Sequence, residues 1–263
     1  MKLIVLAAGF ATRLYPLTQD CPKALLPLGP RRGGRDKLLI EHVLDATRGI
    51  SGTDRVYVVS NALFIDRFET WLQEYRTTCP GTVIELVNDG VQKEDRRLGA
   101  VGDLQFVIDH HNLDEDVAVV AGDNLFSQPL TGFREFCESK NGPVVGVYDV
   151  GDLAQVQKYS EVHTDGDGCI VFFEEKPPQP RRTLVAIALY YYPRAVLPRI
   201  REYLQSNNPD QSGRLIQWLY SHVRCYAWPV PGQWLDVGSY ETLAAARRLC
   251  AEGNSLSSGP VHP

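Results

Sequence analysis

The sequence predicts an α/β protein whose central sheet is mixed and mainly parallel. Short apolar runs rich in β-branched residues alternate with longer segments of helical periodicity through the first half of the 263 residues. Parallel strands joined in this way need right-handed crossovers, which place helices on both faces of the sheet. The length suits one domain with a substantial core, so we expect a sandwich of helices, sheet and helices.

The first element is the run Leu3 to Leu6, which is apolar and too short for a helix, and which therefore predicts a buried strand. It opens into the small-residue loop 7–13, of sequence AAGFATR. Small residues let the backbone approach a ligand, and free N–H groups suit phosphate oxygens. Arg13 and Lys23 add two positive charges beside that loop. The stretch predicts a site for an anion that carries several phosphates.

The elements that follow keep the same alternation, up to a strand that ends before Gly122. The apolar spacing predicts helices over residues 38–47, 62–75 and 99–108 and buried strands over 56–59, 82–87 and 117–121. Between them, Pro30 to Arg35 is basic and Gly-rich, and we expect a flexible insertion there. Asn88 to Leu98 is a polar loop at the carboxyl end of a strand, where such loops cover ligands in α/β folds.

The pattern changes after Pro143, where strands become more frequent. The turn of sequence DGDG, residues 165–168, predicts a hairpin that pairs strand 161–164 with strand 170–175. We further expect strands over 144–150, 184–192 and 224–230 and helices over 153–159, 194–205, 213–221 and 240–251. Residues 253–263 are expected to form a disordered tail.

Composition limits the classes of partner that we expect for this protein. The net charge is −5 and the chain has no basic arm, which argues against nucleic acid. No apolar run approaches the length of a membrane span, and we expect no signal peptide because Met1-Lys2 runs directly into a strand. The six cysteines are scattered without a C-x-x-C pair, as in a cytoplasmic enzyme with reduced thiols. A homo-oligomer stays possible.

Asp123 follows the buried strand 117–121 directly, after Gly122. A carboxylate at the carboxyl tip of a central strand faces the ligand side of the sheet, where it can hold a hard cation. The alternative is an Asp that only caps a turn. Because Asp123 is expected beside the phosphate-binding loop 7–13, we favour metal ligation.

Three stretches together carry a family resemblance. Gly9, Thr12, Arg13, Pro22 and Lys23 match the loop G-x-G-T-R and the later P-K of the sugar-phosphate nucleotidyltransferases, with Ala11 at the usual second glycine. Residues 175–177 match the E-K-P motif of that family, and residues 234–238 match its W-x-D-x-G motif. The chain therefore resembles the sugar-nucleotide pyrophosphorylases over most of its length.

The resemblance implies a Rossmann-like fold and a Mg²⁺-dependent enzyme. In this family an NTP and a sugar 1-phosphate give an NDP-sugar and pyrophosphate, mainly by positioning and charge neutralisation. We expect a nucleotidyltransferase domain over 1–252, with a nucleotide-binding part over about 1–125 and an acceptor-binding part over about 126–252. No hexapeptide repeat follows, so no β-helix extension is expected.

The resemblance also implies roles for particular residues. Asp123 and Asp236 would bind Mg²⁺, and Arg13, Lys23 and Lys176 would be the catalytic cations, with Lys176 on the acceptor phosphate. We expect the nucleotide to contact Leu6, Ala8, Gly9, Thr12, Arg13, Lys23, Asn88, Gly99 and Asp123. We expect the acceptor to contact Asn124, Tyr159, Ser160, Glu175, Lys176, Ile187, Ala188 and Trp234.

The acceptor side departs from the family pattern at two places. Tyr159-Ser160 stands where other members have Tyr-Gly, and Ile187-Ala188 stands where they have Thr-Gly. Loss of glycines and of a hydroxyl suggests a narrower and less polar pocket, suited to a deoxy sugar, a cyclitol phosphate, or a small alcohol phosphate or phosphonate. Neutral drift in a variable pocket is an equal alternative.

The nucleobase stays open at this stage. Ala24 occupies a position where thymidylyl members often have Gln, which argues weakly against dTTP. A cytidylyl- or guanylyltransferase that acts on a non-standard acceptor is the alternative function. An inactive paralogue is disfavoured, because all the cations and carboxylates expected in the site are present.

Overall fold

The structure is a computed structural model that describes residues 1–30 and 36–256. In this part of the chain the main sheet has nine strands, and its longest path runs in the order β10-β9-β11-β6-β1-β4-β5. These strands are β1 (Lys2–Leu6), β4 (Arg55–Ser60), β5 (Ile84–Asn88), β6 (Val117–Ala121), β8 (Val144–Asp149), β9 (Ser160–Thr164), β10 (Ile170–Glu175), β11 (Leu184–Tyr192) and β12 (Tyr226–Pro229).

The strands β5, β4, β1 and β6 are parallel neighbours, because each is joined to the next by a helical crossover. The second half of the chain adds antiparallel strands, beginning with β11 against β6. The expected hairpin forms, with Phe173 of β10 opposite Val162 of β9. The predicted fold class, a mixed and mainly parallel sheet between helices, is confirmed.

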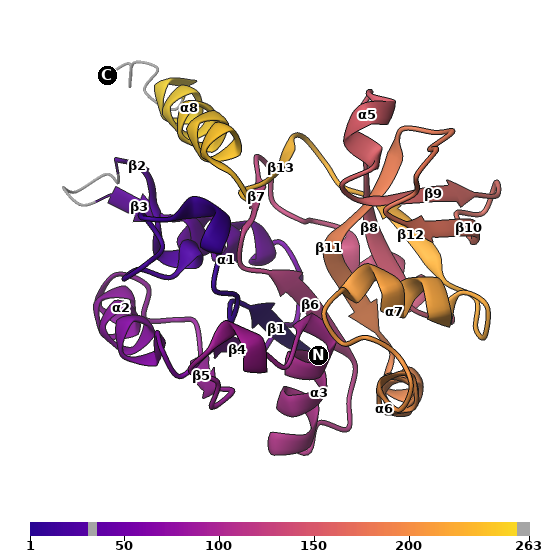
Figure 1. Cartoon of the computed structure of the whole chain (residues 1–263), viewed down its shortest axis with the longest axis horizontal. Coiled ribbons are helices and arrows are strands. Elements are labelled where there is room, and N and C mark those ends of the chain that lie inside the picture. Colours follow the sequence, from indigo (N-terminus) through magenta and orange to yellow (C-terminus); the bar gives the residue numbers. More distant parts are fainter. Residues whose placement is uncertain (31–35, 257–263) are drawn as a thin grey trace, which may run out of the picture.

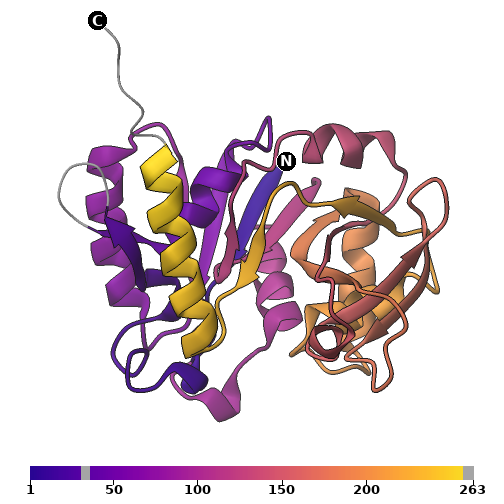
Figure 2. The same cartoon turned by 90° about the horizontal axis from the view of Figure 1, so that it is seen from above.

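Helices cover both faces of the sheet (Figures 1 and 2). Alternate residues of β1 belong to opposite cores: Leu3 and Val5 pack with α1, α2 and α4, whereas Ile4 packs with α3, α6 and α7. The helices are α1 (Leu39–Thr47), α2 (Ile65–Thr78), α3 (Ala100–His110), α4 (Phe133–Ser139), α5 (Leu153–Val156), α6 (Leu197–Leu204), α7 (Ser212–Leu219) and α8 (Tyr240–Leu256).

A third, smaller layer lies over the edge of α1. It contains two short ribbons, β2 (Pro27–Pro30) with β3 (Asp36–Leu38), and β7 (Asn124–Phe126) with β13 (Trp234–Asp236). The helix α8 packs on both ribbons (Figure 1) and buries Leu243 and Ala246. This layer joins the end of the chain to the loop that follows β1.

Several boundaries differ from the sequence-based expectation. The helix predicted over 153–159 ends at Val156, and the one predicted over 194–205 starts as a 3₁₀ turn, Arg194–Val196, before α6. The helix α4 and both ribbons were not predicted. The last helix continues to Leu256, past the predicted end at Ala251, so the predicted tail is wrong for its first residues. The rest of that tail, and residues 31–35 of the predicted insertion, lie outside the described residues.

The strand β11 changes partner along its length, and this creates the opening in the sheet. Val185 and Ala186 pair with β9, whereas Leu189 to Tyr192 pair with β6 on the same side. Between them the register with β8 also shifts. Ile187 and Ala188 therefore lie at the point where β9 and β6 separate, next to the carboxyl end of β6. Ligands bind at such points in open α/β sheets.

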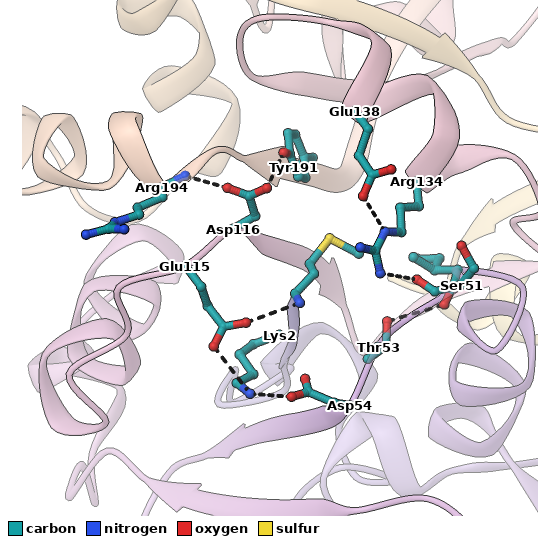
Figure 3. A network of polar contacts seen from close by, with 12 residues as sticks. Lys2, Ser51, Thr53, Asp54, Glu115, Asp116, Arg134, Glu138, Tyr191 and Arg194 are labelled. Atoms are coloured by element: carbon teal, nitrogen blue, oxygen red, sulfur yellow. Dashed lines mark hydrogen bonds and ion pairs between the residues drawn. The ribbon is translucent and has the colours of Figure 1, made fainter.

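The opposite, amino-terminal edge of the sheet is joined by polar contacts (Figure 3). The Lys2 ammonium pairs with Asp54 at 2.6 Å and with Glu115 at 3.3 Å, which links β1 to the residues that precede β4 and β6. Asp116 accepts hydrogen bonds from the Tyr191 hydroxyl and the Arg194 N–H. The Asp116 contacts thereby tie β6 to β11 and to Arg194, which follows that strand, and all these contacts lie away from the loops at the carboxyl edge of the sheet.

No helix among the described residues is long and apolar enough to cross a membrane.

Candidate active site

Two adjoining cavities open at the carboxyl edge of the sheet. The first cavity, of about 260 Å³, lies over the loop after β1 and reaches the start of α3. The second cavity, of about 230 Å³, lies between the ribbon β7–β13, the hairpin and the start of α7. Both are lined by Ala121, Asp123, Ala188, Asp210 and Ser212. Asp123 thus stands on their common boundary.

The loop after β1 presents backbone rather than side chains to the first cavity. A Cβ at Gly9 would meet nothing within 4 Å. Ala11, at the position of the usual second glycine, has the left-handed φ of 52° that glycine adopts more easily. No described group accepts a hydrogen bond from the backbone N–H groups of residues 8–11. The loop therefore offers donors to an anion.

A chain of side-chain hydrogen bonds holds Asp123. The Lys23 ammonium donates to Asp123 Oδ2 at 2.5 Å, and the Asn124 amide donates to Asp123 Oδ1 at 2.8 Å. The indole Nε1 of Trp234 in turn donates to Asn124 Oδ1 at 2.5 Å. Burial raises the pKa of Asp123, but the charge and hydrogen bond of Lys23 and the hydrogen bond of Asn124 outweigh it and hold that pKa below its usual value.

Asp236 is brought beside Asp123 by the ribbon. In the pairing of β13 with β7, Asp236 lies opposite Asn124, and Val237 N donates to Asp123 O at 3.0 Å. Burial and then the charge of Asp123 raise the pKa of Asp236, while Lys23 and Arg13 oppose that rise. The Asp236 carboxyl group is therefore both buried and close to a second negative charge, that of Asp123.

The second cavity contains most of the residues expected to bind the acceptor. Asn124, Tyr159, Ser160, Glu175, Ile187, Ala188 and Trp234 all line it. The Ser160 hydroxyl donates a short hydrogen bond to Glu175, whose Oε2 would be 1.9 Å from a Cβ placed at Gly213. Glu175 is therefore held between β9 and the first turn of α7, and only a glycine at 213 leaves room for it.

Four expected site residues lie outside the cavity linings. Asn88 uses its Oδ1 to accept from Gly90 N, Thr12 is exposed in a 3₁₀ turn, and Arg13 is exposed but influences Asp236. Lys176 has a left-handed φ of 52°, and its N–H donates to Tyr159 O at 2.7 Å. That turn leaves the Lys176 side chain exposed. The other residues expected at the nucleotide, Leu6, Ala8, Gly9, Lys23, Gly99 and Asp123, line the first cavity.

Sequence reasoning missed some residues that line the cavities. Asp89 and Asp103 line the first cavity and Lys158 the second. Arg97 and Asp210 also line the first cavity, where two hydrogen bonds of 2.7 and 2.9 Å join them. One signal was available for Asp103: it lies four residues before Val107, on the buried side of a helix, where a charged side chain is unusual.

The donor set suits a hard divalent cation between Asp123 and Asp236. Carboxylate oxygens are the ligands that Mg²⁺ prefers, and the raised pKa of Asp236 indicates negative charge that a cation would balance. Among residues 1–30 and 36–256, no group of three or more His, Cys, Asp or Glu side chains could hold a metal. A cation here would complete its coordination with phosphate oxygens and water.

Known proteins resemble this chain over most of its length. The model of a family described as nucleotidyl transferase matches residues 2–253. A Sulfolobus acidocaldarius protein provisionally named a mannose-1-phosphate guanyltransferase is 28% identical over 238 residues, which are 90% of this chain and 60% of that protein. A glucose-1-phosphate thymidylyltransferase of Mycolicibacterium smegmatis is 28% identical over 253 residues, which are 94% of this chain and 81% of that protein.

A solved structure has the same fold. It is a Bacillus anthracis protein provisionally described as a glucose-1-phosphate thymidylyltransferase, in complex with a sucrose. The TM-score is 0.77 at 22% identity, over 95% of this chain and 94% of that one. The resemblance found in the signature loop and its two companion motifs is thereby confirmed over nearly the whole chain, and the protein belongs to the nucleotidyl transferase family.

Proposed function

We propose that this protein joins a nucleoside triphosphate to a sugar 1-phosphate, with release of pyrophosphate. A phosphate oxygen of the acceptor attacks the α-phosphorus, a new P–O bond forms, and the bond to the β-phosphate oxygen breaks. The electron pair of that bond leaves with pyrophosphate. No protein nucleophile is required, because such transfers depend on positioning and charge neutralisation.

One observation carries this proposal. Asp123, which forms an ion pair with Lys23, lies on the boundary that the two cavities share. The loop donors of the first cavity suit the phosphates of the nucleotide, and the second cavity suits a polyhydroxyl acceptor. Two phosphorylated substrates placed in these cavities meet at Asp123, which is what a transfer between them needs.

Each charged group has a proposed task at that boundary. Lys23 and Arg13 neutralise charge on the α-phosphate and the departing pyrophosphate. Asp123 and Asp236 would hold Mg²⁺, which would supply positive charge beside the phosphates of the substrates. Trp234 and Asn124 keep Asp123 in a fixed orientation.

The proposed division into a nucleotide-binding part, 1–125, and an acceptor-binding part, 126–252, follows the linings. The first cavity is lined mainly by residues 6–123 and the second mainly by residues 121–236. Ala188, Asp210 and Ser212 cross that division, because they also line the first cavity. The two parts therefore act on one site rather than as separate modules.

Lys158 is our assignment for the acceptor phosphate, in preference to Lys176. Both are exposed, but only Lys158 lines the second cavity. Glu175 and Asn124 are proposed to bind acceptor hydroxyls. Ile187 is only 2% exposed, and its Cγ1 would be 3.1 Å from a Cβ at Gly146, so its bulk lies in the core. Its proposed effect on the acceptor is that it offers no hydroxyl group, whereas a threonine at this position would offer one.

Pyrophosphate release from five nucleoside triphosphates against a panel of phosphorylated acceptors tests this proposal. The panel includes glucose, mannose and deoxy-sugar 1-phosphates, a cyclitol phosphate and a small alcohol phosphate. Turnover that needs both substrates and Mg²⁺, and that yields an NDP-sugar by mass spectrometry, supports it. Pyrophosphate formed from the nucleotide alone, at the same rate with and without acceptor, contradicts it.

A further inference from the structure

Two carboxyl groups meet in the first cavity, at the start of α3. Asp89 follows β5, and Asp103 lies in the first turn of α3. Both line the cavity, and their carboxyl groups lie close enough to interact. Asp103 is only 7% exposed, and its buried Oδ1 has no hydrogen-bond partner among the described residues. A buried acceptor without a partner is uncommon, and a donor from a ligand in the adjoining cavity would satisfy it.

No described cation balances this pair. Arg97 lines the same cavity, but its guanidinium is bound to Asp210 through two hydrogen bonds. Asp89 Oδ1 accepts only from the backbone N–H of Val91, at 2.7 Å. Burial, followed by the neighbouring Asp89 charge, raises the pKa of Asp103 to about 7. The closeness of the two carboxyl groups and this raised pKa favour one proton shared between them near neutral pH.

The shared proton decides what the pair offers to a ligand. Since it lies between Asp89 and Asp103, the pair turns only acceptors toward the cavity. The apolar surroundings, Leu6, Ala8 and Ala100, suit the faces of a flat heterocycle. Lys23 and Asp123 line this same cavity and lie at its boundary with the second one, where the phosphates would bind. The base of a nucleotide would then extend toward the carboxyl pair.

The four common kinds of base edge differ in how they meet two acceptors. Uracil and thymine carry carbonyl oxygens on both sides of one N–H, and these oxygens would face the carboxyl oxygens. Adenine and cytosine each place a ring acceptor beside the amino group. Guanine places two donors side by side, N1–H and the N2 amino group, and so matches a pair that only accepts.

We propose that Asp103, supported by Asp89, binds the Watson–Crick edge of guanine and makes GTP the preferred nucleotide. This inference rests on the proposed function for its choice of ligand, but it can fail separately. The Asp103 carboxylate receives the donors, and Asp89 fixes its orientation. Uracil and thymine nucleotides are rejected, because they would leave the carboxyl oxygens against carbonyl oxygens.

The experiment measures both binding and turnover with the whole chain. Calorimetry gives the Kd of GTP, ITP, ATP, CTP and UTP in the presence of Mg²⁺ without acceptor, and pyrophosphate release gives kcat/KM with the best acceptor. We expect GTP to bind at least tenfold more tightly than UTP. ITP lacks the N2 amino group, so it should lose most of that advantage.

Asp103→Asn is the test variant, because it keeps the shape of the side chain but replaces an acceptor with a donor. It should reduce the preference for GTP over UTP at least tenfold, with kcat for UTP unchanged or higher. Asp95→Asn, in an exposed 3₁₀ turn outside the lining, is the matched control and should change neither value.

The outcomes separate the two proposals. If nucleotides bind with this preference but no acceptor is converted, the proposed function fails and the inference stands. If turnover occurs but GTP is bound no better than UTP, or Asp103→Asn leaves the preference unchanged, the inference is overturned and the proposed function stands. Absence of nucleotide binding overturns both.

Discussion

The indole of Trp234 donates a 2.5 Å hydrogen bond to the side-chain oxygen of Asn124, a residue 110 positions earlier in the chain. The contact fixes the Asn124 amide with its nitrogen toward Asp123, so the orientation of a carboxylate at the end of β6 depends on a residue of β13. Trp234 is thereby a positioning residue for the cation site as well as a wall of the second cavity.

Trp234→Phe should lower kcat on the order of tenfold with little change in the KM for the nucleotide. The phenyl ring keeps most of the packing, but Asn124 Oδ1 loses its donor and stays buried, which costs about 1–3 kcal/mol of stability. Steady-state kinetics and thermal unfolding measure the two effects. Trp218→Phe, in α7 and outside both linings, is the control, and an equal kcat loss there would contradict the assignment.

Asp123→Asn and Asp236→Asn should each reduce turnover by about a hundredfold or more and raise the Mg²⁺ concentration for half-maximal rate. Asp236→Asn should leave the melting temperature unchanged or raise it, because it removes a buried charge beside Asp123. Activity in Mg²⁺ titrations and circular dichroism provide the measurements. Near-normal turnover in either variant is incompatible with the proposed cation site.

Lys158→Ala should raise the KM for the acceptor on the order of tenfold, since loss of a charge-assisted hydrogen bond costs about 1.5 kcal/mol or more. Lys176→Ala should have a smaller effect, because its side chain lies outside the second cavity. Neither variant should change the KM for the nucleotide. A larger effect of Lys176→Ala would restore the role that the motif suggested for it.

Gly213→Ala should weaken acceptor binding without altering nucleotide binding. The added methyl group would lie 1.9 Å from Glu175 Oε2 and would force that carboxylate away from Ser160. We expect the KM for the acceptor to rise about tenfold or more, the effect of losing a hydrogen bond to a charged group. Gly166→Ala is a matched control, because a Cβ there meets nothing within 4 Å. Unchanged acceptor kinetics in Gly213→Ala would argue against a binding role for Glu175.

Asp103→Asn should also change how stability depends on pH. The native pKa of Asp103 is raised to about 7 from an ordinary 3.8, so the folded state binds this proton more tightly than the unfolded state. The corresponding stability is present below pH 4 and is lost as pH rises toward and through 7. The variant should be more stable than the parent at pH 8, by ~1 kcal/mol or more, and equal to it near pH 4. Urea unfolding at both pH values decides this, and a pH-independent difference contradicts the pairing with Asp89.

Much of the fold was predictable because its signals are local. Buried strands such as β1 and β6 are short runs rich in β-branched residues, and the Asp-Gly turn predicts the hairpin of β9 and β10. The ribbon of β7 and β13 was not predictable in this way. It has three residues in each strand, and its partners are 110 residues apart, so no local pattern marks it.

The candidate site shows the same difference between local sequence signals and contacts between distant residues. Asp123 and Asp236 were expected from their motifs, but their proximity depends on that ribbon. Lys176 was expected at the acceptor from its motif, yet its left-handed backbone turns the side chain to solvent. Asp103 belongs to none of the matched motifs, and the glycines before it indicate only the start of a helix. A motif identifies residue types, whereas backbone conformation decides where their side chains point.

The polar contacts of Figure 3 lie at the edge of the sheet opposite the cavities. The residues that make these contacts, such as Lys2, Asp54 and Asp116, are therefore not the ones that face the substrates. Substitutions at 103, 158 or 188 can alter which substrates fit, while the polar contacts at the amino-terminal edge of the sheet are kept. A scaffold arranged in this way can acquire new substrate preferences in small steps, because changes of specificity and losses of folding fall on different residues.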